Sequence, residues 1–270
     1  MPSPFCNGWV IFRAGEYKLA CMPLFRRTAA LLIAALAFPA AQARAADPLI
    51  LGFVARPGLA EIIDGKPAGT YFPTAVAVAE KAGFAVTLQA VSQMRLMAQV
   101  QSGTPSYCAV GIFVTPERQT FSKFTLPIYR TPRFVVIATR GKDSDIRRHK
   151  TFMSLIADRQ LRMGLIDGYS LGNTLDPLIA AMRGNVDRYV GTFDQGFAKI
   201  QAGRFDYIIG FADEFDNWVG RTGASRDAFS KIDFPDVLDG VHRHLMCSRA
   251  VDDAVIERLN TAIQALVPHP

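Results

Sequence analysis

The sequence predicts an α/β fold with two lobes and a cleft between them. Three observations predict it: strand-like and helix-like segments alternate from Asp47 onward, the alternation starts again near residue 161, and short crossings join the two runs. Composition agrees, because 270 residues with 50% apolar and 20% charged content suit a globular chain of one large domain or two small ones.

The first run starts with a strand and ends at a capped helix start. Its segments, read by hydrophobic period and by breakers, are PLILGFVA (48–55, strand), TYFPTAVAVAEKAGF (70–84, helix), AVTLQAV (85–91, strand), SQMRLMAQVQSG (92–103, helix) and SYCAVGIFV (106–114, strand), followed by TPER (115–118). This βαβαβ order predicts parallel strands. The two prolines of TLPIYRTP (125–132) indicate a crossing rather than one continuous element.

The second run shows the same alternation of strands and helices. After a strand RFVVIATR (133–140), the second run has LRMGLI (161–166), DRYVGT (187–192), FDYIIGF (205–211) and VHRHLMCSR (241–249) as strands. DGYSLGNTLDPLIAAMRG (167–184) forms a turn and helix, and TFDQGFAKIQAGR (192–204) and DDAVIERLNTAIQALV (252–267) form helices. In open α/β sheets ligands settle at the strand ends, so the cleft between the two runs is the expected binding site.

Residues 1–45 have the design of a secretory signal peptide. From Met22 a basic MPLFRR precedes the apolar TAALLIAALAFPA and a small-residue site at Ala43-Arg44-Ala45. The apolar run is too short to span a membrane. We expect translation to start at Met22, cleavage after Ala45 or Ala46, and a periplasmic mature chain that begins near Asp47.

Charge argues against a nucleic-acid partner. The formal net charge is +6, but residues 1–45 carry +4 of it, which leaves only +2 on the rest. The longest basic run, 147–150, falls in an expected loop and suits a solvated turn better than a phosphate track. No nucleic-acid binding is therefore predicted.

Two cysteines remain once the signal segment is removed, Cys108 and Cys247. An even pair in an exported chain indicates a disulfide. Two separate buried thiols are the alternative, since free cysteine is commonly buried. The oxidising compartment favours the bridge.

The TPER stretch contains one residue that its helix start does not explain. Thr115 suits the N-cap, Pro116 the first helical position, and Glu117 the positive end of the helix dipole. Arg118 is disfavoured there unless it and the free amides hold an anion. Otherwise its side chain would turn outward into solvent.

Three segments carry a resemblance to a known family: DGKPAGTYFPTAVAVAEKAG (64–83), MRLMAQVQSG (94–103) and GIFVTPERQTFSKFTLPIYRT (111–131). The mature chain resembles the extracytoplasmic solute-binding proteins of family 3, the polar amino acid type. The resemblance implies a type II periplasmic-binding-protein-like fold, in which each lobe is a mixed sheet flanked by helices. It implies a first lobe of about 47–129 plus 243–270, a second lobe of about 133–239, and hinges near 128–132 and 239–243.

The resemblance also implies a function and a site. Such proteins close on a small solute and deliver it to an inner-membrane ABC permease, and we expect this chain to do so as a monomer, without a cofactor. In the family the TPER arginine binds the ligand carboxylate, which is Arg118 here. Gly111 falls where the family offers a backbone group. Ser170 and the amide of Leu171 fall where it offers donors, although Ser170 also suits a helix cap.

Two positions depart from the family pattern. Phe113 stands where the amino acid receptors usually have a threonine, and Phe211 where many have the aspartate that binds the ligand ammonium. Asp213 and Glu214 lie just beyond and would either replace that aspartate or be exposed loop acids. Two phenyl rings at polar positions favour a flatter or more apolar ligand that still carries an anion.

Further candidates surround the expected cleft. Phe53, Tyr71 and Phe72 would form its aromatic walls or else belong to the core, and Arg56 would be a second cation or an ordinary surface arginine. His242 and His244 lie two apart on a strand without a third ligand nearby, so no metal site is predicted.

Other functions on the same scaffold stay open. A cyclohexadienyl dehydratase-like enzyme would need Glu214 or Asp213 as a proton donor, and a sensory receptor would report the ligand to a membrane partner. The chain has no G-x-S-x-G, H-E-x-x-H or P-loop pattern, and we therefore expect a binding protein rather than an enzyme.

Overall fold

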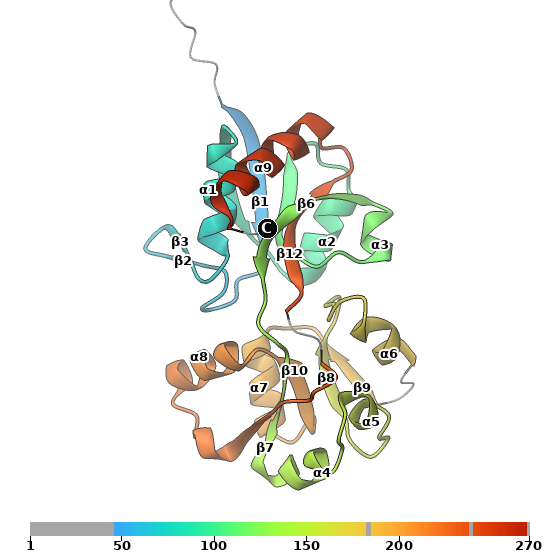
Figure 1. Cartoon of the computed structure of the whole chain (residues 1–270). Coiled ribbons are helices and arrows are strands. Elements are labelled where there is room, and N and C mark those ends of the chain that lie inside the picture. The colour runs from blue at the N-terminus through green and yellow to red at the C-terminus, as the bar shows by residue number, and fades with distance from the viewer. Residues whose placement is uncertain (1–45, 182–184, 238–239, 269–270) are drawn as a thin grey trace, which may run out of the picture. The chain divides into compact units, whose positions relative to one another are not determined.

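The chain is described from a computed structural model, in which residues 46–181, 185–237 and 240–268 are placed. The predicted signal segment lies outside these ranges. The described residues form two five-stranded sheets and a two-stranded ribbon (Figure 1). Within them no helix is long and apolar enough to cross a membrane.

The first sheet has the order β4-β1-β5-β12-β6. Its strands are β4 (Phe84–Ala90), β1 (Asp47–Phe53), β5 (Tyr107–Ile112), β12 (His242–Ser248) and β6 (Ser122–Arg130). The βαβαβ prediction is confirmed, because β1 pairs in parallel with both β4 and β5. β12 then pairs antiparallel with β5 and β6, so the sheet is mixed and the end of the chain completes it.

We call this sheet with its flanking elements lobe 1. They are the ribbon β2 (Glu61–Ile63) and β3 (Lys66–Ala68) and the helices α1 (Phe72–Lys81), α2 (Gln93–Gln101), α3 (Pro116–Gln119) and α9 (Asp253–Leu266). Each of the last three follows a side-chain N-cap, in chain order Ser92, Thr115 and Asp252. α9 lies along α1 and β6, as the red and blue-green ribbons of Figure 1 show.

The second sheet, in lobe 2, has the order β11-β7-β10-β8-β9. Its strands are β11 (Phe229–Ile232), β7 (Val135–Thr139), β10 (Tyr207–Gly210), β8 (Met163–Ile166) and β9 (Val186–Tyr189). Its helices are η1 (Arg140–Lys142), α4 (Asp143–Arg147), α5 (Phe152–Ile156), α6 (Leu175–Ala181), α7 (Phe193–Gln201), α8 (Ala212–Thr222) and η2 (Arg226–Ala228). The pattern of the sequence did not indicate α4, α5, α8 or β11.

Aromatic rings hold α7 and α8 against this second sheet. Phe197, Phe215, Trp218 and Phe229 lie with ring centroids 5.2–5.9 Å apart, and all four are buried. Large rings bury much apolar area, which anchors the start of α8 firmly to the sheet. α8 carries Asp213 and Glu214 in its first turn, so these two acids are helical rather than loop residues.

Two chain crossings join the lobes, and they are bonded to each other. The amide of Thr131 donates to the carbonyl of Val241 (3.0 Å), and the amide of Val241 donates to the hydroxyl of Thr131 (2.9 Å). A side chain on Gly240 would meet the Thr131 carbonyl at 2.4 Å, so the close approach requires glycine. Both connections therefore run side by side.

The expectation of a crossing at residues 125–132 was wrong for most of that stretch. β6 continues through Pro127 to Arg130. It is an edge strand, and Pro127 pairs with His244 where the register shifts, so the missing amide removes no central ladder bond. The change of lobe comes only after Arg130.

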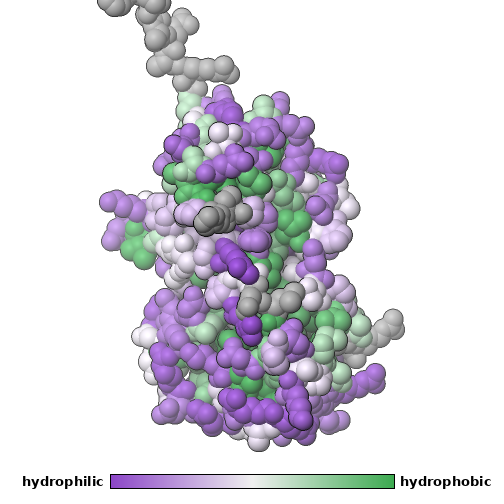
Figure 2. Space-filling model, viewed as in Figure 1, coloured by the Kyte–Doolittle hydropathy of each residue, from purple (hydrophilic) through white to green (hydrophobic). Residues whose placement is uncertain are grey.

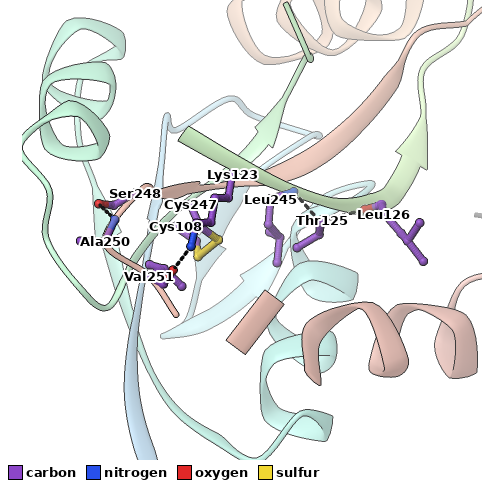
Figure 3. Close-up of a disulfide and its surroundings, with 9 residues drawn as sticks. All are labelled: Cys108, Lys123, Thr125, Leu126, Leu245, Cys247, Ser248, Ala250 and Val251. Carbon is purple, nitrogen blue, oxygen red and sulfur yellow. Dashed lines mark hydrogen bonds between the residues drawn. A yellow bond between two sulfur atoms is a disulfide. The ribbon is translucent and has the colours of Figure 1, made fainter. Parts of the chain in front are cut away.

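The structure joins Cys108 on β5 to Cys247 on β12 by a disulfide (Figure 3). The two residues are directly paired across the antiparallel ladder and are fully buried. Lys123 of the neighbouring β6 donates to the carbonyl of Val251 beside the bridge (2.7 Å). The link ties the chain's last strand to its first βαβαβ unit.

The basic run at residues 147–150 lies among acidic side chains. Hydrophilic residues predominate on the face shown in Figure 2. In the basic run 147–150, Arg147 bonds to Asp143 (2.9 Å), while Arg148 and His149 both contact Asp158 (2.5 and 3.0 Å). Most of that run is therefore neutralised locally.

Candidate functional site

Arg118 turns into the molecule rather than outward into solvent. Its helix, α3, has only four residues, so the dipole argument for its position carries little weight. Its amide donates to the Thr115 hydroxyl (3.2 Å), and its side-chain Nη1 donates to the Phe113 carbonyl (3.0 Å). The residue is 8% exposed, which excludes the solvent-facing alternative.

The charge of Arg118 has no carboxylate partner among the described residues. Burial lowers its pKa, and Asp176 only partly offsets that effect. The oxygens of Asp176 accept hydrogen bonds from the Ser170 hydroxyl (2.5 Å) and the Leu171 amide (2.7 Å). A buried guanidinium without an acidic partner is unfavourable by itself and provides a ready site for an anion.

Arg56 is buried and paired across the lobes. Its Nε and Nη2 donate to the two oxygens of Glu214 (2.8 and 2.6 Å), and its Nη1 donates to the Tyr169 hydroxyl (2.7 Å). Its guanidinium carbon lies 4.3 Å from the centroid of the Phe193 ring. Burial opposes the charge, but Glu214 and the nearby phenols raise the pKa of Arg56. The structure thus places Arg56 at the cleft with its charge already balanced.

Arg243 was not among the residues singled out from the sequence. It lies on β12, is 4% exposed, and donates from Nη1 to the Gly111 carbonyl (2.5 Å). Its guanidinium lies 4.4 Å from the centroid of the Phe113 ring, and burial lowers its pKa. Among the described residues its Nε has no hydrogen-bond partner. Arg243 lies on the same face of the strand as buried Leu245 and Cys247, because side chains alternate between the two faces. This alternation was the signal in the sequence that could have identified Arg243 as buried.

These arginines line one inner pocket together with side chains of both lobes. Its free volume is about 20 Å³, because the protein's own side chains nearly fill it. The residues that line it are Val54, Arg56, Tyr71, Gln93, Leu96, Val110, Gly111, Ile112, Phe113, Arg118, Tyr169, Ser170 and Arg243. Arg118, Tyr169 and Ser170 also line a wider cleft of about 550 Å³. The two spaces therefore meet at Arg118.

Several predicted residues gather at this pocket. Gly111, Phe113, Ser170 and Tyr71 all line it. Phe211 lies behind it, stacked on Phe134 (4.7 Å), which in turn meets Phe113 edge-on (6.3 Å). This aromatic row forms an apolar wall beside the guanidinium of Arg243, 5.7 Å from the Phe211 ring.

Other predicted residues do not reach the pocket. Phe53 packs on Phe72 (centroids 4.2 Å apart) in the core, the alternative considered from the sequence. Asp213 is exposed and accepts a hydrogen bond from the amide of Glu214 (2.9 Å). Leu171 follows Ser170 but lines neither the inner pocket nor the wider cleft, and its amide donates to Asp176. No group of three possible metal ligands occurs in the described parts of the chain.

Gly111 offers a direct test of how tightly the site is built. Its φ is +75°, and an added Cβ would lie 2.5 Å from the Tyr71 ring. We expect Gly111→Ala to lower the free energy of unfolding by about 2 kcal/mol or more, from left-handed strain of about 1–2 kcal/mol and overpacking of about 1–3 kcal/mol. Unfolding in denaturant measures this change in the free energy of unfolding. Gly141→Ala, at an exposed position with no atom within 4 Å, should stay near wild type.

The family model of the bacterial extracellular solute-binding proteins, family 3, matches residues 58–267. The chain belongs to this family. The resemblance carried by residues 64–83, 94–103 and 111–131 is thereby confirmed. No curated protein matches the chain in sequence.

Solved structures place this family 3 protein in the same fold class. The arginine-, lysine-, histidine-binding protein ArtJ from Geobacillus stearothermophilus has a TM-score of 0.64 at 15% identity, covering 82% of this chain and 90% of its own. Holo ArgBP from T. maritima has 0.62 at 19% (82% and 91%), and AbpA from Streptococcus pneumoniae bound to L-arginine has 0.61 at 18% (81% and 88%). The predicted two-lobed α/β fold is confirmed; at these identities the likeness concerns the fold alone.

Proposed function

We propose that this protein is a periplasmic receptor that captures a small carboxylate-bearing solute between its lobes and delivers it to an ABC transporter, with Arg118 as the carboxylate ligand. The observation that carries the proposal is the position of Arg118: buried, unpaired with any described carboxylate, and facing both the inner pocket and the wider cleft. A planar guanidinium grips a carboxylate through two parallel hydrogen bonds.

We expect the two lobes to close on the solute because each lobe contributes some of the residues that line the inner pocket. Arg118 and Gly111 belong to lobe 1, while Ser170 and Tyr169 belong to lobe 2. A solute that touches both sets gains contacts only when the lobes meet, and it thereby shifts the equilibrium towards the closed form. We place the hinge at the two bonded crossings near Thr131 and Val241. We infer a monomer of lobe 1 (47–129 and 243–270) and lobe 2 (133–239), exported by the signal segment 1–45.

The position of Glu214 does not favour the dehydratase-like alternative. Both of its oxygens accept hydrogen bonds from Arg56, so neither is placed to hand a proton to a leaving hydroxyl. Asp213 is exposed and outside the pocket lining. We therefore propose that the protein binds its solute without covalent chemistry.

A thermal-shift screen of the mature protein tests the proposed function. The panel contains amino acids, aliphatic organic acids and aromatic acids. A ligand present at about 100 times its Kd stabilises the folded state by about 2.7 kcal/mol, which raises the midpoint by roughly 5–10 °C in a protein of this size. We expect a carboxylate to give this shift and its uncharged amide not to. An equal shift with the amide would contradict the proposal.

A further inference from the structure

The inner pocket carries more positive charge than the protein itself neutralises. Three arginines line it, and no acidic side chain of the described residues does. Arg56 is balanced by Glu214, which contacts it with both oxygens. Among the described residues, the guanidinium groups of Arg118 and Arg243 donate only to backbone carbonyls, those of Phe113 and Gly111. Two buried guanidinium groups therefore have no carboxylate bonded to them among the described residues.

The acidic residues nearby are not bonded to Arg118 or Arg243. Asp176 lines the wider cleft, as do Glu117 and Asp167; its oxygens accept hydrogen bonds from Ser170 and Leu171, and it only partly offsets the effect of burial on the pKa of Arg118. Glu214 is the acid that faces the inner residues, and its oxygens are occupied. Because isolated buried charges are strongly unfavourable, the pocket should bind a ligand with two negative charges more tightly than a ligand with one.

The position that would best suit a cationic group of a ligand is occupied by Arg56. The guanidinium of Arg56 lies among the rings of Tyr169 (5.3 Å), Phe193 (4.3 Å) and Phe211 (5.9 Å). This is an aromatic cage with a carboxylate, the arrangement that would otherwise bind an ammonium or guanidinium from outside. The chain's own arginine takes that position, so none of the described residues that line the inner pocket offers a free acid to the amine of an amino acid.

We propose that the solute is a dianion without a cationic amine, and that Arg243 is its second anion-binding residue beside Arg118. This inference rests on the proposed function and names its ligand class. Arg243 is suited to the role because one edge is fixed by Gly111 and the ring of Phe113, while its Nε stays unpartnered. A dicarboxylate with an apolar middle matches the apolar character of the aromatic row, and because the inner pocket has only about 20 Å³ free, the side chains that fill it must move apart to admit it. Inorganic phosphate is the other source of two negative charges.

Calorimetry with matched ligands tests this on the mature protein. The probes are phthalate isomers against benzoate, glutarate against butyrate, inorganic phosphate, and L-arginine. We expect a dicarboxylate to bind more than about 30-fold tighter than its monocarboxylate partner, the effect of one added buried charge pair. Binding of phosphate without any dicarboxylate would identify a phosphate-type ligand. Tightest binding by L-arginine, equal binding within each matched pair, or no response to any dianion at millimolar concentration would overturn the inference.

Variants separate this inference from the proposed function. Arg243→Gln should remove the preference for the dianion, with dicarboxylate and monocarboxylate then binding alike, whereas Arg243→Lys should retain part of it. Arg204→Gln, an exposed arginine of lobe 2, is the matched control. Unfolding midpoints without ligand show that each variant folds. If Arg118→Ala abolishes binding and Arg243→Gln leaves the preference intact, the second anion site is wrong and the receptor function stands.

Discussion

Replacing Arg118 with alanine should remove most of the ligand affinity. Removing one partner of a buried, hydrogen-bonded charge pair costs about 2–5 kcal/mol, or about 30- to 5,000-fold in Kd. The loss should be large because Arg118 is 8% exposed and its guanidinium is bonded to no described carboxylate. Isothermal titration with the best carboxylate from the screen measures the change.

Two further variants show whether the effect is specific. Arg118→Lys keeps the charge but cannot form two parallel hydrogen bonds, so its affinity should be intermediate. Arg204→Ala removes an exposed arginine and should bind as wild type does. Without ligand, Arg118→Ala should be as stable as wild type or more so, because the uncompensated charge is gone. Affinity near wild type in Arg118→Ala would refute the carboxylate assignment.

Removing the disulfide should give the largest loss of stability. Cys108 and Cys247 are 139 residues apart in sequence, and the bridge ties β12 to β5 in the centre of the first sheet. In the chain-entropy model a loop of this length is worth at most about 5 kcal/mol, with about 2–4 kcal/mol typical of measured bridges. The double variant Cys108→Ala, Cys247→Ala should unfold at correspondingly lower denaturant concentration.

Chemical reduction separates the contribution of the disulfide bond to stability from the contribution of packing by the two cysteine side chains. Wild type in a thiol reductant should lose nearly as much stability as the double variant does. The double variant itself should be insensitive to the reductant. If wild type keeps its unfolding midpoint after complete reduction, the bridge contributes nothing and the loss in the variant comes from the buried volume removed.

Much of lobe 1 could be predicted because its signals are local. The N-caps Ser92, Thr115 and Asp252 and the alternation of strands and helices depend on neighbouring residues only. Lobe 2 was harder: α8 begins without a side-chain cap at Phe211. Its place is set instead by rings that α8 buries against the second sheet, a tertiary effect that no window of sequence contains.

The binding site divides in the same way. By itself the sequence determined the family, the TPER turn with Arg118, and the two phenylalanines that depart from the amino acid pattern, since each lies within a short motif. Only the tertiary structure decided which charges are balanced. Arg56 and Glu214 are 158 residues apart and Arg243 and Gly111 are 132 apart, and burial makes the presence or absence of a partner decisive for each guanidinium. Contacts over such separations exist only once the sheets have assembled.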